Sequence, residues 1–266
     1  MPIQVKSFFH PDSSTFSYVV HDPASGQAAL IDAVLDYDPD TDATSETPLR
    51  PLLEHVQANG LEVQWLLETH AHADHVSAGR RLKRQFPRAR LGIGDGIGAV
   101  QATFAPRYAL DLPLARNPFD HLFADGEAFA LGELRGRVIA VPGHTSDSIA
   151  YLIDDALFPG DSLFMPDGGT ARCDFPGGDA ALLYRSIQRL LALPEDTRVF
   201  VCHDYGPGGR DIANETTIGA QRAHNIHVHD GVDEAAFVAM RQARDATLPE
   251  PKLMQAAVKA NIQGGA

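Results

Sequence analysis

Short apolar runs separated by turn residues dominate the first third of the chain. Residues 17–21 and 27–33 are predicted strands, joined by the turn cluster H-D-P-A-S-G. Residues 63–68, V-Q-W-L-L-E, are more uniformly apolar, which is typical of a strand that is buried on both faces. A further short strand is predicted over residues 90–93.

Helices are predicted where apolar residues recur every three or four positions between capping and helix-breaking residues. Thr47 can cap a helix that has Pro48 at its first position and ends near Gly60. A second helix is predicted over residues 76–86 and stops before a proline. A third is predicted over residues 179–193, where the leucines and an isoleucine fall on one helix face.

The second half of the chain repeats this alternation. Four strand-like runs lie between residues 121 and 164, and a fifth covers residues 198–202. Helical patterns follow at about residues 216–225 and 232–246. The order of strands, helices, more strands and more helices predicts an α/β fold in which two sheets pack together with helices outside.

Composition and charge narrow the choice of partners and location. Hydrophobic residues make up 44% of the 266 residues, enough for a sizeable core, and the formal net charge is −13. Because nucleic acids and anionic membranes are polyanions, this charge argues against both as partners. The two cysteines, the lack of a signal-peptide pattern and the lack of a long apolar stretch predict a cytoplasmic protein with reduced thiols and no membrane span. The oligomeric state stays open, with a homodimer among the options.

Residues 69–75, T-H-A-H-A-D-H, crowd metal-binding side chains together directly after the predicted buried strand. Further candidates follow strand-like runs in P-G-H-T, P-G-D and V-C-H-D-Y. Imidazole and carboxylate groups are natural ligands of zinc, iron and manganese. The seven candidate ligands at predicted strand ends are His70, His72, Asp74, His75, His144, Asp161 and His203. The pattern therefore predicts a metal centre assembled from several strand ends.

These four motifs, in this order, resemble those of the metallo-β-lactamase superfamily. The resemblance implies an αββα sandwich of two mixed sheets, with helices on the outer faces and a metal cleft along one edge. It covers nearly the whole chain, so residues 1–266 are expected to form one domain, in which C-terminal helices from about residue 212 complete the substrate side. In dinuclear members of the superfamily, one metal would be held by His70, His72 and His144, the second by Asp74, His75 and His203, with Asp161 bridging them.

Finer motifs resemble the persulfide dioxygenase branch of this superfamily. They are G-T-A-R-C-D-F-P-G-G, L-Y-R-S, H-D-Y, T-T-I-G-A-Q-R-A-H-N and the tail L-P-E-P-K-L-M-Q-A-A-V-K-A-N. That branch binds a single iron(II) and uses O₂ to oxidise glutathione persulfide to sulfite and glutathione. The resemblance carries its iron ligands over to His70, His144 and Asp161. Two histidines and one carboxylate also form the facial triad of non-haem iron oxygenases, which leaves open positions for a substrate sulfur and O₂.

The remaining candidates then surround the iron. His72, Asp74, His75 and His203 would orient ligands and bound water, and the last three are predicted to take part in catalysis. The same four residues could instead help to hold a second metal, as two zinc ions or a mixed iron–zinc pair.

The substrate side is predicted from two residues. The arginine of the branch's G-x-x-R-x-D-F stretch, here Arg172, would bind a substrate carboxylate, with a structural ion pair as the alternative. Tyr205 could donate its hydroxyl toward the substrate, or could be a packed structural residue. Where human-type members have N-P-R, this chain has Asn225, Ile226 and His227. The thiol carrier therefore stays open among glutathione, coenzyme A and other small thiols.

Three other functions compete with this hypothesis. A glyoxalase II-type thioester hydrolase would use all seven candidate ligands for two metals and a bridging hydroxide, but it adds a larger helical substrate domain after the last histidine. A β-lactam hydrolase would be exported, and the sequence shows no signal-peptide pattern. A non-catalytic metal or redox sensor would keep the fold without the activity. The R-C-D-F and H-D-Y stretches favour the dioxygenase.

The two cysteines are candidates for sulfur chemistry only if they are exposed and have a lowered pKa. Cys202 ends a predicted buried strand and is predicted to be structural. Cys173 follows Arg172 and can line the cleft, so its role stays open.

Overall fold

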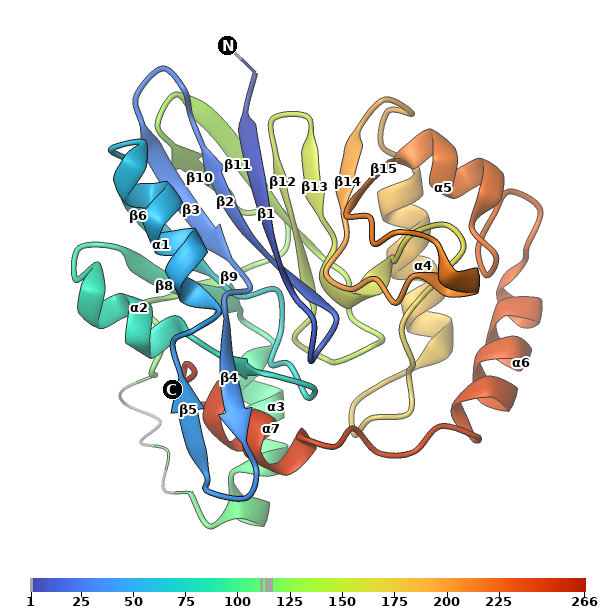
Figure 1. Ribbon diagram of the computed structural model, residues 1–266. Helices are drawn as coiled ribbons and strands as arrows, with labels where there is room; N and C mark the ends of the chain where they lie inside the picture. The colour runs from blue at the N-terminus through green and yellow to red at the C-terminus, as the bar shows by residue number, and fades with distance from the viewer. Residues whose placement is uncertain (1, 111, 113–116) are drawn as a thin grey trace.

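Two six-stranded mixed sheets lie face to face in the computed structural model, which describes residues 2–110, 112 and 117–266 (Figure 1). The first sheet contains, in spatial order, β1 (Gln4–His10), β2 (Thr15–His21), β3 (Gln27–Ile31), β6 (Glu62–Leu67), β8 (Arg90–Gly94) and β9 (His121–Phe123). The second contains β10 (Ala128–Leu131), β11 (Leu134–Ala140), β12 (Ile149–Ile153), β13 (Ala156–Phe158), β14 (Arg198–Phe200) and β15 (Glu215–Thr217). A small third sheet is formed by β5 (Ala43–Ser45), β4 (Val34–Asp38) and β7 (Val76–Ser77).

Helices cover the outer faces of the sandwich, as the sequence predicts. Figure 1 shows α1 (Leu49–Ala58) and α2 (Gly79–Gln85) on the side of the first sheet, and α4 (Ala180–Leu191), α5 (Ile218–His224) and α6 (Glu234–Asp245) on the side of the second. The remaining helices are α3 (Ile97–Phe104) and α7 (Met254–Asn261). In the described part of the chain, no helix is both long and apolar enough to cross a membrane.

Two apolar cores hold the layers together. The first lies between the sheets, where Tyr18 and Phe158 meet edge to face, and it extends across the second sheet to Leu183 and Phe237 on the outer helices. The second packs the outer face of the first sheet against α1, α2, α3 and α7. The αββα sandwich expected from the alternating pattern is therefore present, because each sheet buries one face against its partner and the other under helices.

Local boundaries differ from the prediction at several positions, most clearly in the first two helices. The helix predicted over residues 76–86 begins only at Gly79, because Val76 and Ser77 pair with β4 as strand β7. The helix predicted after Thr47 begins at Leu49 and has no side-chain cap, so the capping role predicted for Thr47 is wrong. Helix α7 was not predicted at all.

The strand order brings several strand ends to one edge of the sandwich. Strand β6 runs into the T-H-A-H-A-D-H segment, β13 ends three residues before Asp161, and β14 ends three residues before His203. His144 lies in the loop between β11 and β12. The two sheets are also joined at this edge, where the backbone N–H of Phe16 donates to the carbonyl of Cys202 at 2.7 Å. Loops from both sheets therefore meet at one place.

Candidate metal centre

The seven predicted ligands lie together in one cluster, buried except for the half-buried Asp74, that contains two adjoining groups. In the first group, His70, His144 and Asp161 offer ligand atoms within 4.8 Å of one another. Asp161 Oδ2 lies 3.5 Å from His144 Nε2 and 4.0 Å from His70 Nε2. Two imidazoles and one carboxylate thus converge on a common point.

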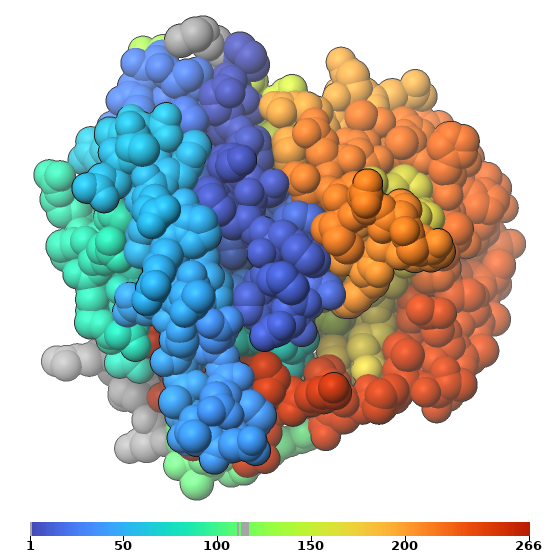
Figure 2. Space-filling model, in the orientation of Figure 1, coloured from blue at the N-terminus to red at the C-terminus, as the bar shows by residue number. Residues whose placement is uncertain are grey.

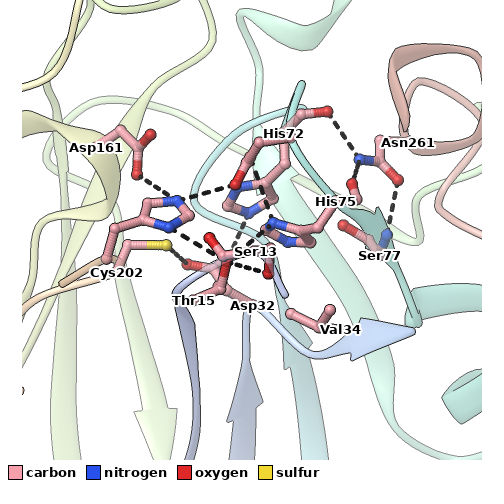
Figure 3. A network of polar contacts seen from close by, with 12 residues as sticks. Ser13, Thr15, Asp32, Val34, His72, His75, Ser77, Asp161, Cys202 and Asn261 are labelled. Atoms are coloured by element: carbon pink, nitrogen blue, oxygen red, sulfur yellow. Dashed lines mark hydrogen bonds and ion pairs between the residues drawn. The ribbon is translucent and has the colours of Figure 1, made fainter. Parts of the chain in front are cut away.

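The second group lies directly beside the first and contains His72, Asp74, His75 and His203. The two groups touch through Asp161, whose Oδ1 is 3.3 Å from His203 Nε2. His203 Nε2 is also 3.5 Å from Asp74 Oδ2. Figure 3 shows Asp161, His72 and His75 around this network. His72 offers its ligand atom to the second group rather than to the first.

In each histidine of the cluster, one ring nitrogen contacts a polar group that lies outside the set of candidate ligands. His144 Nδ1 lies 2.7 Å from the carbonyl oxygen of Arg172, and a carbonyl can only accept, so Nδ1 carries the proton. In the same way, His72 Nε2 donates to the carboxylate of Asp32 at 3.1 Å, and His203 Nδ1 faces the carbonyl of Ser14 at 3.3 Å. When the ring is neutral, the opposite nitrogen of each of these histidines offers a lone pair that faces the cluster.

Several inward-facing atoms are buried without a hydrogen bond to any described residue: His70 Nε2, His72 Nδ1, His75 Nε2, His203 Nε2, Asp74 Oδ2 and Asp161 Oδ1. Buried polar groups are almost always satisfied, so this concentration of unpaired donor atoms needs a partner. Neutral imidazole lone pairs and carboxylate oxygens are the ligand types of zinc and iron. The residues therefore fit a bound metal cation, and the donor set is large enough for one or two.

Opposing effects shift the pKa values within the cluster. Burial, and then the neighbouring His72, hold the pKa of His70 well below its ordinary value, which favours the neutral ring that a metal needs. At His203 burial also disfavours the charge, but the carboxylates of Asp161 and Asp74 outweigh it and raise the pKa to about 10. At Asp161 burial opposes ionisation, but His203, His70 and His144 hold the pKa well below its ordinary value.

Asp32 belongs to the site although the sequence pattern did not single it out. It follows β3 and is 3% exposed. One carboxylate oxygen accepts from the backbone N–H of Thr69 at 2.8 Å and from His72 Nε2, and the other accepts from the hydroxyl of Thr69 at 2.9 Å. Asp32 thereby fixes the start of the T-H-A-H-A-D-H segment. A carboxylate placed directly after a buried strand is the same signal that identified Asp161.

The segment is held at two further points that were also missed. Asp147, buried three residues after His144, accepts from the backbone N–H of Ala71 at 2.8 Å. Asn261 of α7 donates to the carbonyls of His72 and His75, both at 2.9 Å, and accepts from Ser77 at 2.9 Å (Figure 3). Thus α7 supports the metal-binding segment from behind.

Thr15 joins the two histidines of the second group that face the N-terminal hairpin. It is fully buried, and its hydroxyl lies 3.4 Å from His75 Nδ1 and 3.2 Å from His203 Nδ1. A further hydrogen bond of 2.7 Å connects it to Ser13, as Figure 3 shows. The hairpin therefore orients both rings.

A cavity of about 340 Å³ opens in front of the cluster, and its floor includes Asp74, His144, Asp161 and His203. Its apolar walls are formed by Ala73, Phe164, Phe175, Tyr205, Leu248 and Pro251. This volume lies within the range of small-molecule sites. Figure 2 shows the outer rim, where the orange loop near residue 205 and the red C-terminal segment flank a recess.

Tyr205, predicted to face the substrate, lies at this opening. Its ring is parallel to that of His203, with 6.1 Å between the centroids, and 62% of the residue is exposed. A tyrosine packed for purely structural reasons would be far less exposed, so its position is compatible with contact to a bound molecule.

Arg172 lines the same cavity, but its guanidinium is engaged by the protein. Its Nε and Nη2 each donate to the carboxylate of Asp174 at 2.6 Å, and its Nη1 donates to the carbonyl of Pro249 at 2.7 Å. It also stacks on Phe175, with 4.9 Å from the guanidinium carbon to the ring centroid. The carboxylate-binding role stays a prediction, and a substrate would have to compete with Asp174 for this side chain.

Both cysteines are buried and free. Cys173 is 7% exposed, and burial raises the pKa of its thiol to about 12. Cys202 is 2% exposed, and burial together with Asp161 raises the pKa of its thiol well above its ordinary value. A thiol of this kind is a weak nucleophile at neutral pH.

The folded protein is therefore expected to react slowly with a disulfide reagent at pH 7, because neither thiol is exposed or ionised. Titration in 6 M guanidinium chloride should release the thiol equivalents of two cysteines. Rapid modification of one cysteine in the native protein would instead identify a reactive thiol, which only Cys173, next to the cavity, could supply.

Comparison with known proteins places the chain among related sequences. The metallo-beta-lactamase superfamily profile matches residues 10–203, a range that includes all seven candidate ligands. A beta-lactamase hydrolase-like protein of Xylella fastidiosa is 47% identical over 263 residues, covering 98% of this chain and 61% of the relative. The chain thus spans somewhat less than two thirds of that relative.

Two other relatives carry more specific names. Glyoxylase B2 of Dictyostelium discoideum is 42% identical over 265 residues, covering 98% of this chain and 91% of the relative. The mitochondrial persulfide dioxygenase ETHE1 of Homo sapiens is 29% identical over 267 residues, covering 99% and 89%. Among solved structures, ETHE1 from Myxococcus xanthus superposes with a TM-score of 0.79 at 31% identity, covering 99% of this chain and all of the other.

Proposed function

Because the chain belongs to the metallo-β-lactamase superfamily, we propose that it is a persulfide dioxygenase with one iron(II) held by His70, His144 and Asp161. The observation that carries the proposal is the convergence of two histidines and one carboxylate, whose ligand atoms lie within 4.8 Å of one another beside the other four donors. The first group has the composition of the facial triad. The similarity to ETHE1 proteins over nearly the whole chain also supports assignment as a persulfide dioxygenase.

The reaction balances with one persulfide, one O₂ and one water. The S–S bond breaks, the terminal sulfur is oxidised by four electrons to sulfite, O₂ accepts these electrons, and the thiol and two protons are released. Bound iron would supply a redox-active Lewis acid with coordination positions open to both reactants.

The surrounding residues have definable tasks in this reaction. The cavity admits the persulfide past Tyr205, and its apolar walls limit the access of water. Since two protons are released, a base must lie near the reacting sulfur. His203 Nε2 lies within 3.5 Å of carboxylate oxygens from both Asp74 and Asp161, so these three side chains can relay the released protons toward the cavity that they line.

A thioester hydrolase is the second candidate, and two observations favour it. His72, Asp74, His75 and His203 can hold a second cation, with Asp161 beside them. Glyoxylase B2, one of the more similar relatives, carries a name from that class. The metal content of active protein separates the two functions. We expect one iron per chain after anaerobic purification, and activity restored by one equivalent of iron(II). Activity that requires two zinc ions per chain would support the hydrolase.

Substitution of Asp74 or His75 by alanine should lower turnover about 10- to 100-fold, while iron content falls much less. The reason is that, with one metal, these residues orient groups around the iron rather than bind it. Iron analysis and O₂ uptake measured on the same preparations check this. Asp74→Asn, which keeps the shape of the side chain, is the matched variant. Loss of iron as complete as in Asp161→Ala would make both residues metal ligands.

A further inference from the structure

Three arginines line the cavity in front of the metal centre: Arg172, Arg241 and Arg244. The rest of the site is acidic or neutral, since Asp74 and Asp161 form part of its floor and the chain carries a net charge of −13. An anionic thiol persulfide would be repelled from such a site without a cation to bind it. Which of the three arginines is available therefore bears on the choice of substrate.

Two of these arginines already have partners. Arg172 pairs with Asp174 through two hydrogen bonds and binds the carbonyl of Pro249. Arg241 is 1% exposed, pairs with Asp245 and donates to the carbonyl of Thr170 at 2.9 Å. Both side chains connect the loop around residue 172 to the C-terminal segment, which makes them part of the cavity wall.

Arg244 differs from both. It lies in the last turn of α6 and is exposed. Within residues 2–110, 112 and 117–266, no carboxylate forms an ion pair with it, and its guanidinium makes no hydrogen bond. Its backbone is nevertheless fixed, because its carbonyl accepts from both the N–H and the hydroxyl of Thr247. Arg244 thus lines the cavity from a fixed backbone, with a guanidinium that none of the described residues engages.

Position 227, where the human-type motif carries an arginine, cannot supply the positive charge here. His227 is 9% exposed, and its Nδ1 accepts from the backbone N–H of Thr170 at 3.0 Å. Burial, and then the nearby Arg241 and Arg244, lower the pKa of His227 to about 4, so it is neutral near pH 7. The cation for a substrate anion must come from another element, and α6 offers one.

We propose that Arg244 binds a carboxylate of the thiol carrier, so that this site selects a carboxylate-bearing thiol persulfide such as glutathione persulfide over a neutral one. The inference rests on the proposed function for the identity of the reacting group. The guanidinium is suited to the task, because it pairs with a carboxylate through two parallel hydrogen bonds. The contact is to a carboxylate that does not react, so it should contribute equally to the ground and transition states.

The test compares two substrates and four proteins. The substrates are glutathione persulfide and the persulfide of glutathione diethyl ester, in which both carboxylates are neutralised. The proteins are the wild type, Arg244→Ala, Arg244→Lys and the control Arg84→Ala, which removes an exposed last-turn arginine of α2 that does not line the cavity. Steady-state O₂ uptake gives KM and kcat, and calorimetry gives the Kd of glutathione itself.

Arg244→Ala should raise KM for glutathione persulfide and the Kd of glutathione about 3- to 5-fold, less than for a buried contact because water screens the pair. The kcat should change less than about 2-fold, Arg244→Lys should recover part of the loss, and KM for the diethyl ester should not change. An unchanged KM and Kd in Arg244→Ala would overturn the proposal, as would an equal rise for both substrates. If the wild type consumes no O₂ with persulfide but cleaves a glutathione thioester, the proposed function fails, and the Kd of glutathione still decides the role of Arg244.

Discussion

Replacement of Asp161 by alanine is expected to remove most of the bound metal and to lower activity by more than the roughly 10- to 100-fold loss typical of residues that only support a ligand. Asp161 is the only anion in the group with His70 and His144, and its Oδ2 faces both Nε2 atoms. Without it, two neutral imidazoles would have to hold a divalent cation alone.

Asp161 follows a turn that requires a glycine, and this makes the prediction more specific. The preceding Gly160 has a φ of +53°, and a Cβ at that position would lie 2.7 Å from the hydroxyl of Thr69. The turn depends on the glycine at position 160 rather than on the carboxylate of Asp161, so the metal loss is expected to report the missing carboxylate. Metal analysis of Asp161→Ala beside Asp161→Asn checks this, and full metal content in the alanine variant would exclude Asp161 as a ligand.

Replacement of Asp32 by alanine is expected to lower the free energy of unfolding by about 3–5 kcal/mol, as for the loss of one partner from a buried charged network. The N–H and hydroxyl of Thr69 and the Nε2–H of His72 would all lose their acceptor in a dry environment. Asp32→Asn should lose less, because the amide keeps one oxygen and tolerates the φ of +50° found at this position.

Guanidinium chloride unfolding of metal-free protein measures this effect without a contribution from metal binding. Asp40→Ala, which removes an exposed carboxylate that has no ion pair among the described residues, should change the stability by less than about 0.5 kcal/mol. If Asp32→Ala were as stable as the Asp40 control, the network around Thr69 would contribute nothing to folding.

The sandwich and the seven candidate ligands could be predicted because their signals are local. Each strand can be recognised from the apolar pattern of its own residues, and each ligand lies within about eight residues after the end of a strand, so no long-range information is needed. The two sheets and the outer helices follow from the order of these segments.

Contacts between distant segments could not be predicted in the same way. Asn261 supports the carbonyls of His72 and His75 from α7, almost two hundred positions along the chain, and nothing around Asn261 in the sequence marks it. Similarly, the ion pair of Arg172 with Asp174 is visible in R-C-D, but its bond to the carbonyl of Pro249 depends on how the C-terminal segment packs. Residues 76–77 form a strand because β4 lies beside them, which overrides their helical pattern.

The most direct test of the proposed function is the stoichiometry of the reaction in the iron-loaded protein. We expect one O₂ consumed and one sulfite formed per glutathione persulfide, with glutathione as the second product and no cleavage of S-lactoylglutathione in a parallel assay. Rapid cleavage of the thioester without O₂, together with no O₂ uptake in the presence of persulfide, would contradict the proposal and identify the protein as a hydrolase.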